Sequence, residues 1–183
     1  MNNYFVILAA GKSKRFSSKI AKQHIVYKNK EIIDHSIEKA LNSKIFKQII
    51  IVTNDLNRLK KRKYPKLIKI IKGGKERSDS SFKALKYLKK YKPKNVFIHD
   101  AARPNFSINL LKNLNKHIKN NKAVVPYINT DNSTKYNQGS KIINLNRKKV
   151  LLTQTPQCFK FKTLYNLSKK NKSLITDEAT LFL

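Results

Sequence analysis

The sequence predicts an α/β protein, with a mostly parallel sheet covered by helices on both faces and a β-hairpin arm that projects from it. The first observation is that short apolar runs such as Asn95–His99 alternate with longer segments whose apolar residues recur at helical spacing. The second is that these runs are continuously apolar, which is typical of parallel strands buried on both faces. The third is a polar stretch, Thr130–Gln154, that interrupts the alternation.

The first elements follow this pattern closely. Tyr4–Ala10 is an apolar run that ends in small residues, and the polar loop Gly11–Gln23 comes after it. Glu31–Asn42 carries isoleucines, alanine and leucine on a helical period, whereas Gln48–Thr53 reads as a buried strand. Asn54–Asp55 is a suitable start for a lysine-rich helix, because such side chains cap helix N-termini.

The alternation continues through the middle of the chain. A strand is expected at Leu67–Ile71, where the pair Gly73–Gly74 stops it. Ser78–Tyr91 and Ile108–Asn120 have apolar residues at helical spacing, so both are predicted helices. The apolar run Ala123–Ile128 is expected to form one further strand.

The polar stretch is predicted to be the arm, at about residues 130–154. It is centred on Asn137-Gln138-Gly139 and has short β-prone flanks, Lys141–Leu145 and Val150–Thr153. The chain has 183 residues, of which 40% are hydrophobic. This length suits one domain, so residues 1–183 are expected to form a single domain plus the arm.

The formal net charge of +31 has two readings. It could attract a polyanion such as RNA, DNA or a membrane surface. However, the lysines are scattered over every predicted helix, and Lys, Asn, Ile and Tyr are abundant together, as A/T-rich codons specify. We favour this compositional explanation. Neither a recognition helix nor an aromatic-rich basic strand is evident, so no nucleic-acid or membrane partner is expected.

The expected location is cytoplasmic. No apolar run is long enough to span a bilayer, and Tyr4–Ala10 is too short to be the core of a signal peptide. The lone Cys158 excludes an internal disulfide and fits a reducing compartment. Without a nearby histidine or acid in the sequence, Cys158 is expected to serve packing.

Candidate functional residues follow the ends of predicted strands, where ligands bind in open parallel sheets. After the first strand come Ala9, Ala10 and Gly11, whose small size lets a ligand approach free backbone amides. Arg15 and the flanking lysines add positive charge suited to a polyphosphate. The stretch lacks the second glycine and Gly-Lys-Ser/Thr of a P-loop and the later glycines of a dinucleotide fingerprint. The alternative for this stretch is a basic surface turn without a ligand. Lys22, further along the same loop, could likewise be an ordinary solvated lysine.

Two more strand ends carry candidates. In the segment Gly73–Ser80, the glycines permit a tight turn, Ser78 or Asp79 could cap the following helix, and Ser80 could face a ligand. An ordinary glycine turn is the alternative.

The other strand end is His99-Asp100-Ala101-Ala102-Arg103-Pro104. Here Asp100 could hold a phosphate-bound Mg²⁺ or a ribose, and Arg103 could reach a phosphate. The four histidines lack metal-ligand spacing, so His99 is expected to be structural.

Six motifs in order resemble the 2-C-methyl-D-erythritol 4-phosphate cytidylyltransferase family: LAAGKSKRF, KQ, GGKERSDS, HDAARP, TPQ and TDEA. The resemblance implies a Rossmann-like domain, CTP and a small sugar-alcohol phosphate as substrates, Mg²⁺ as cofactor and a homodimer built through the arm. Transfer to another polyol phosphate such as ribitol 5-phosphate, whose enzymes tend to carry HDAVRP, is the alternative.

The resemblance also implies residue roles. Arg15 and Lys22 would be catalytic and stabilise the transition state. Residues implied near the nucleotide are Ala9, Ala10, Gly11, Gly74, Ser80 and Asp100. Residues implied to hold the sugar phosphate, partly from the neighbouring subunit, are Arg103, Thr130, Arg147 and Thr155, with Thr134 as an alternative to Thr130.

The chain departs from the family pattern in a few places. Ala21 stands where the family usually has proline before Lys-Gln, and Ser13 stands where a second glycine is common. Lys75 replaces a frequent acidic residue of the glycine turn. The family continues past TDEA with a strand and a lysine-containing segment, which we therefore expect this chain to lack.

Overall fold

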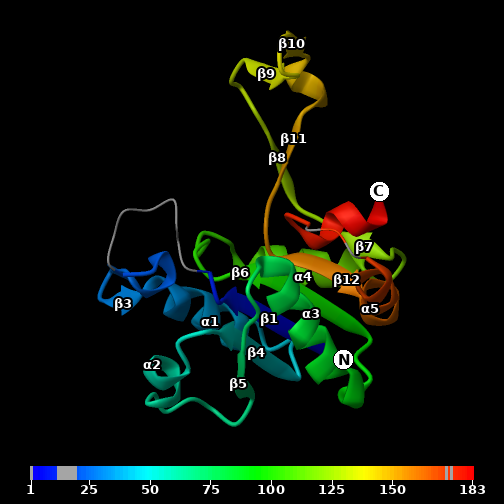
Figure 1. The fold of residues 1–183 in the computed structure, drawn as a ribbon. Helices are drawn as coiled ribbons and strands as arrows, with labels where there is room; N and C mark the ends of the chain where they lie inside the picture. Colours follow the sequence, from blue (N-terminus) through cyan, green and yellow to red (C-terminus); the bar gives the residue numbers. More distant parts are fainter. Residues whose placement is uncertain (1, 12–19, 172, 174) are drawn as a thin grey trace.

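The computed structural model describes residues 2–11, 20–171, 173 and 175–183. Its centre is a six-stranded sheet in the order β5-β4-β1-β6-β12-β7 (Figure 1). These strands are β1 (Asn3–Ala9), β4 (Gln48–Thr53), β5 (Ile68–Lys72), β6 (Asn95–Asp100), β7 (Ala123–Val124) and β12 (Gln157–Lys160). The first four run parallel, whereas β12 lies antiparallel between β6 and β7. The predicted mostly parallel sheet is confirmed.

Helices cover both faces of this sheet. The helices are α1 (Ile32–Ser43), α2 (Leu56–Lys60), α3 (Arg77–Leu88), α4 (Ile108–His117) and α5 (Phe161–Lys170). Short 3-10 turns are η1 (Lys22–His24), η2 (Lys89–Tyr91), η3 (Arg147–Lys149) and η4 (Glu178–Phe182). Phe5 and Ile7 of β1 pack with α1 and α4, whereas Tyr4 and Val6 pack with α3 and α5. Alternate residues of β1 therefore enter two separate cores, which explains its continuous apolar sequence.

The strand register brings the functional loops to one edge of the sheet. Ala9 pairs with Thr53, Thr53 pairs with Lys72, and Leu8 pairs with Asp100. The segments that follow these four strands consequently begin side by side. This edge is the carboxyl end of the parallel strands, where ligands bind in open α/β sheets.

The last third of the chain differs from the sequence prediction. The single strand expected at Ala123–Ile128 is wrong, because Pro126 separates β7 from a different strand, β8 (Tyr127–Asn129). Proline has no backbone N–H to continue a strand ladder, which makes it a natural break. Strand β12 and helix α5 were not predicted from the sequence. Cys158 lies buried within β12 and belongs to the core, as expected.

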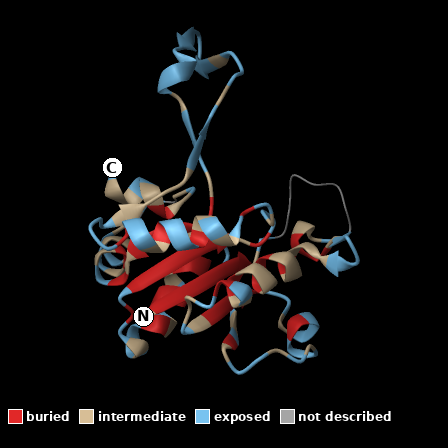
Figure 2. Ribbon diagram, turned by 180° about the vertical axis from the view of Figure 1, so that it is seen from behind, coloured by how far each residue is buried: buried red, intermediate tan, exposed pale blue. Residues whose placement is uncertain are grey.

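The predicted arm is present as two short antiparallel ladders. β8 pairs with β11 (Leu151–Thr153), and further out β9 (Thr134–Asn137) pairs with β10 (Ile142–Leu145). The arm therefore starts at Tyr127 rather than at Thr130. Figure 2 shows it as the exposed extension of a buried sheet. Its exposed large apolar side chains are Tyr127, Ile128, Tyr136, Ile142, Ile143, Leu145, Leu151 and Leu152.

A small hairpin precedes α1. Its strands are β2 (Val26–Tyr27) and β3 (Lys30–Glu31), and the two turn residues Lys28 and Asn29 have positive φ angles. Positive φ at both central positions is typical of tight two-residue hairpins. In the described ranges, no helix combines the length and apolar character needed to cross a membrane.

Candidate functional site

Three backbone segments meet at the carboxyl edge of the sheet. The Asn54 side chain, directly after β4, donates to the carbonyl oxygens of Ala10 and Gly74, each at 3.2 Å. It thereby ties the loop after β1 to the glycine turn after β5. Ala9, Ala10, Gly11 and Gly74 are thus brought together as the sequence predicted. The sequence pattern did not predict this linking role of Asn54, because Asn54–Asp55 before a lysine-rich segment indicates only the start of a helix.

The glycine turn is shaped by close backbone approach. A Cβ atom on Gly73 would lie 2.4 Å from the Ala10 Cβ, and one on Gly74 would lie 2.2 Å from the Asp79 Cβ. Ser80 is buried, and its Oγ accepts from the Gly74 N–H at 3.0 Å and donates to the Glu76 carbonyl at 3.1 Å. Ser80 therefore holds the turn in shape, besides any contact with a ligand.

The start of α3 differs in detail from the prediction. Glu76 is the N-cap residue, rather than Ser78 or Asp79. Asp79 still contributes, because its Oδ2 accepts from the Glu76 N–H at 3.1 Å. This is one half of a capping box, in which the residue three positions into the helix reaches back to the cap.

Asp100 ends β6 and lies in a row of alternating charges. Its Oδ1 accepts from Arg77 Nε at 2.9 Å, and its Oδ2 lies 3.5 Å from Arg103 Nε. Arg77 also binds Glu178, near the end of the chain. The row therefore runs Glu178, Arg77, Asp100, Arg103. Arg77 is part of the motif GGKERSDS, but the sequence pattern alone did not indicate a role for it.

His99 lies inside the protein, as expected for a structural histidine. It is fully buried, Ser36 Oγ lies 3.1 Å from its Nε2, and Thr155 Oγ1 lies 3.0 Å from its Nδ1. Burial, reinforced by the charges of Arg103, Lys39 and Arg77, lowers the pKa of His99 to about 3. Thr155 is itself buried, and the Asp100 N–H lies 3.4 Å from its Oγ1. Thr155 thus lies beside Asp100, next to the candidate edge.

The loop after β1 is described only in part. Arg15 lies outside the described residues. Lys22 opens the turn η1 and is half-buried. The next residue, Gln23, is buried, and its Nε2 donates to the carbonyl oxygens of Ala9 at 2.9 Å and Gly11 at 3.2 Å. Gln23 thus anchors the Lys22 turn to the end of β1, a role that sequence alone did not reveal.

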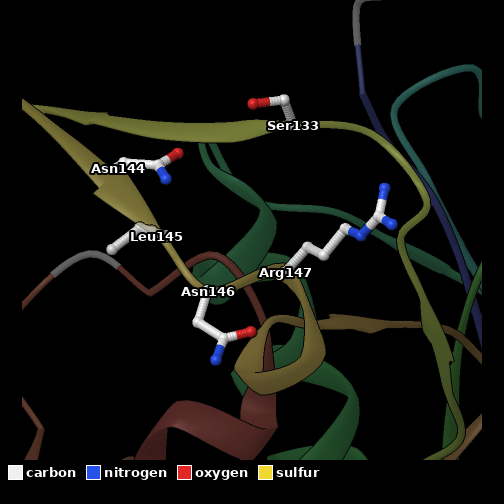
Figure 3. Close-up of a pocket in the computed structure, with 5 residues that line it drawn as sticks. All are labelled: Ser133, Asn144, Leu145, Asn146 and Arg147. Atoms are coloured by element: carbon white, nitrogen blue, oxygen red, sulfur yellow. The ribbon is translucent and has the colours of Figure 1, made fainter.

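The arm residues lie away from this edge. Arg147 is exposed on η3, and its Nη1 donates to the Asp131 carbonyl at 2.7 Å. A hollow of about 470 Å³ lies beside it and is lined also by Ser133, Asn144, Leu145 and Asn146, whose side chains are drawn in Figure 3. Thr130 and Thr134 lie on the same arm, which projects from the sheet (Figure 1). One copy of the chain therefore does not bring these residues to the strand ends.

The described residues offer limited metal ligation. No three histidine, cysteine, aspartate or glutamate side chains among them gather closely enough to hold a metal ion. Asp100 nevertheless provides a carboxylate at the edge. This fits Mg²⁺, which is commonly held by one or two carboxylates together with substrate phosphates.

A Rossmann-like sheet with a glycine turn and a small-residue loop at one carboxyl edge places the chain among α/β proteins built to bind a nucleotide at that edge. The family model of 2-C-methyl-D-erythritol 4-phosphate cytidylyltransferase matches residues 4–182. The chain belongs to that family.

Individual relatives agree with this assignment. The chain is 43% identical over 184 residues to the bifunctional enzyme IspD/IspF of Pelagibacter ubique, and it spans 50% of that protein's length. It is 33% identical to the 2-C-methyl-D-erythritol 4-phosphate cytidylyltransferase of Clostridium kluyveri, covering 98% of this chain and 82% of the relative.

Solved structures show the same fold. Bifunctional IspDF from Campylobacter jejuni matches with a TM-score of 0.86 at 28% identity, covering 99% of this chain and 46% of the other. The 4-diphosphocytidyl-2C-methyl-D-erythritol synthase from Anaerococcus prevotii matches with a TM-score of 0.85 at 25% identity, covering 98% and 82%.

Proposed function

We propose that this chain transfers a cytidylyl group from CTP to 2-C-methyl-D-erythritol 4-phosphate and releases pyrophosphate. The observation that carries the proposal is the joined edge, where Asn54 links the loop after β1 to the glycine turn beside Asp100. The family match supports the choice of reaction. The names of the relatives support the choice of substrates.

The reaction brings two anions together. An oxygen of the sugar-alcohol phosphate attacks the α-phosphorus of CTP, its bond to that phosphorus forms, and the bond to pyrophosphate breaks. A phosphate monoester is already an anionic nucleophile, so no general base is needed. Positioning and cationic stabilisation carry such a reaction. Arg15 and Lys22 would neutralise the charge that develops on the α-phosphate oxygens and on the departing pyrophosphate.

The nucleotide would lie along the joined edge. Ala9, Ala10 and Gly11 would present backbone groups to it, and the Gly74–Ser80 turn would read the base. Mg²⁺, bound mainly through the CTP phosphates, would supply further charge neutralisation, with Asp100 as the ligand from this chain. Arg77 and Arg103 flank Asp100, so its carboxylate is held in a fixed direction.

The sugar phosphate would be held by two groups of residues. Arg103 and Thr155 lie beside Asp100, whereas Thr130 and Arg147 would come from the arm of a second copy. The exposed apolar side chains of the arm support a homodimer built through it. We further propose that the chain acts as one cytidylyltransferase domain with an arm, and that it works in the cytoplasm.

Pyrophosphate release tests the proposal directly. The protein is incubated with CTP, Mg²⁺ and either 2-C-methyl-D-erythritol 4-phosphate or ribitol 5-phosphate. Release is expected with the former, and preferential release with the latter would favour the alternative substrate. Arg15→Ala and Lys22→Ala should each lower kcat by roughly 10²–10³-fold, because each removes a cation from the transition state.

The Lys28→Ala variant is a matched control for the assignment of Arg15 and Lys22 as catalytic. Lys28 is an exposed lysine on the nearby β2–β3 turn, so Lys28→Ala should leave kcat nearly unchanged. Near-normal turnover by both Arg15→Ala and Lys22→Ala would refute the catalytic assignment.

A further inference from the structure

The turn η1, which carries Lys22, is bonded to the carboxylate of Glu31 through His24. Glu31, whose side chain is 11% exposed, precedes α1 and receives hydrogen bonds on both of its oxygens. Oε1 accepts from Arg58 Nε at 3.0 Å and Nη2 at 2.7 Å. Oε2 lies 2.7 Å from His24 Nδ1 and 2.6 Å from Arg62 Nη2. Glu31 thus joins η1 to the region of α2.

Charge fixes the direction of the bond to His24. Burial by itself would raise the pKa of Glu31, but hydrogen bonds from His24, Arg58 and Arg62 outweigh it and hold the pKa below its usual value. Glu31 is therefore an ionised acceptor, and His24 donates from Nδ1. His24 is 5% exposed, so its ring cannot leave this bond for solvent without opening the turn.

Two consecutive residues therefore anchor the Lys22 turn in different directions. Gln23 donates to the carbonyl oxygens of Ala9 and Gly11, at the end of β1. His24 donates to Glu31, at the start of α1. The backbone of the turn is consequently fixed between the central strand and the first helix.

We infer that His24 and Glu31 are positioning residues for Lys22, with Arg58 and Arg62 holding Glu31 in place. The inference rests on the proposed function, in which Lys22 stabilises the transition state. A displacement of a catalytic group by about 1 Å can lower a rate by roughly 10²-fold. The His24–Glu31 bond constrains the turn on the C-terminal side of Lys22.

The first test measures kcat at saturating CTP and sugar phosphate. Glu31→Gln and His24→Leu should each lower kcat about 10-fold or more, because the turn loses a charge-assisted bond. His24→Asn should retain most of the activity, since its amide nitrogen can replace Nδ1 as the donor. The control is Glu38→Gln, which breaks the exposed 2.6 Å pair between Lys30 of β3 and Glu38 of α1 and should leave kcat unchanged.

A double-mutant cycle separates positioning from general damage. If Glu31 acts through Lys22, Glu31→Gln should lower kcat no further in a Lys22→Ala background. An equal fold-loss in both backgrounds would overturn the inference, as would normal kcat for Glu31→Gln. Wild-type protein that released no pyrophosphate would instead refute the proposed function.

A readout without turnover decides the inference in that case. The amide N–H groups of His24 and Ile25 donate to the carbonyls of Ala21 and Lys22 within the turn. Hydrogen exchange at these two amides should quicken in Glu31→Gln and stay unchanged in Glu38→Gln, while exchange in β1 stays slow in both. Unchanged exchange at His24 and Ile25 in Glu31→Gln would overturn the inference whatever the activity.

Discussion

Arg77 Nη1 donates to both carboxylate oxygens of Glu178, at 2.9 and 3.0 Å. Glu178 is 1% exposed and begins η4, whereas Arg77 begins α3 just after the glycine turn. Burial by itself would lower the pKa of Arg77, but Glu178 and Asp100 outweigh it and raise the pKa. Arg77 therefore stays charged and fastens η4 to the start of α3, next to Asp100.

Arg77→Ala should lower the free energy of unfolding by roughly 3–5 kcal/mol, because it leaves the buried Glu178 charge without its partner. Urea denaturation followed by circular dichroism measures this. Lys30→Ala, which breaks an exposed pair, should change stability by about 1 kcal/mol or less. If both variants unfolded at the same urea concentration, the Arg77–Glu178 pair would not be stabilising the fold.

Gly74→Ala should destabilise the protein by about 1–3 kcal/mol, because its new methyl group would overlap Asp79 and force the turn to shift. The melting temperature reports this change. Gly11→Ala is the control, since an added Cβ there meets no described atom within 4 Å. Equal melting temperatures for the two variants would contradict the tight geometry of the glycine turn.

His99 should make the protein less stable in acid. Its pKa is lowered from 6.5 to about 3 on folding, so between these values only the unfolded chain binds the proton. Its contribution to stability is therefore complete above pH 6.5 and is lost as the pH falls towards 3, at roughly 1.4 kcal/mol per pH unit. His99→Gln should flatten the pH dependence of unfolding in this window.

The exposed His117 offers a control for that experiment. His117→Gln should preserve the slope of stability against pH, whatever its effect on absolute stability. A slope that survived in His99→Gln would assign the acid sensitivity to other groups.

Mixed dimers test whether Arg147 acts on the neighbouring subunit. Lys22→Ala and Arg147→Ala should each be poorly active alone. Equal mixtures should regain about a quarter of wild-type activity, since half of the dimers are mixed and each has one intact site. Activity that stayed at the level of the separate variants would place Arg147 and Lys22 in the same subunit's site.

Ala21→Pro should stabilise the protein by about 0.4–1 kcal/mol, because Ala21 already has a φ of −62° and proline restricts the unfolded chain to similar values. Thermal unfolding measures the gain. A loss of stability would mean that proline removes a bond of the residue 21 N–H or clashes with the backbone of Ile20.

The parallel part of the fold was predictable because its strands are apolar on both faces. Gln48–Thr53 was predicted with the bounds that β4 has. Strand β12 gave no such signal, since its four residues, QCFK, mix polar and apolar side chains. Its place in the sheet depends on contacts with β6 and β7, which are distant in sequence.

Part of the candidate site was predictable for the same reason. Gly11, Gly74 and Asp100 could be assigned to one edge because each lies at or just past the end of a parallel strand. Gln23 and Asn54 were not identified, because a carboxamide acquires its role only from the carbonyl groups that tertiary structure places beside it. The candidate roles of Arg15 and Lys22 remain predictions from the family resemblance.

The arm has a consequence for how the protein responds to dilution. It is a two-stranded ribbon along which no α-helix of the described residues packs, and such ribbons are marginally stable in water. In the homodimer proposed above, the second copy would supply much of the ribbon's stability, and the entropy lost in ordering the ribbon would fall on association rather than on folding. Lowering the protein concentration should loosen the ribbon well before the central sheet melts.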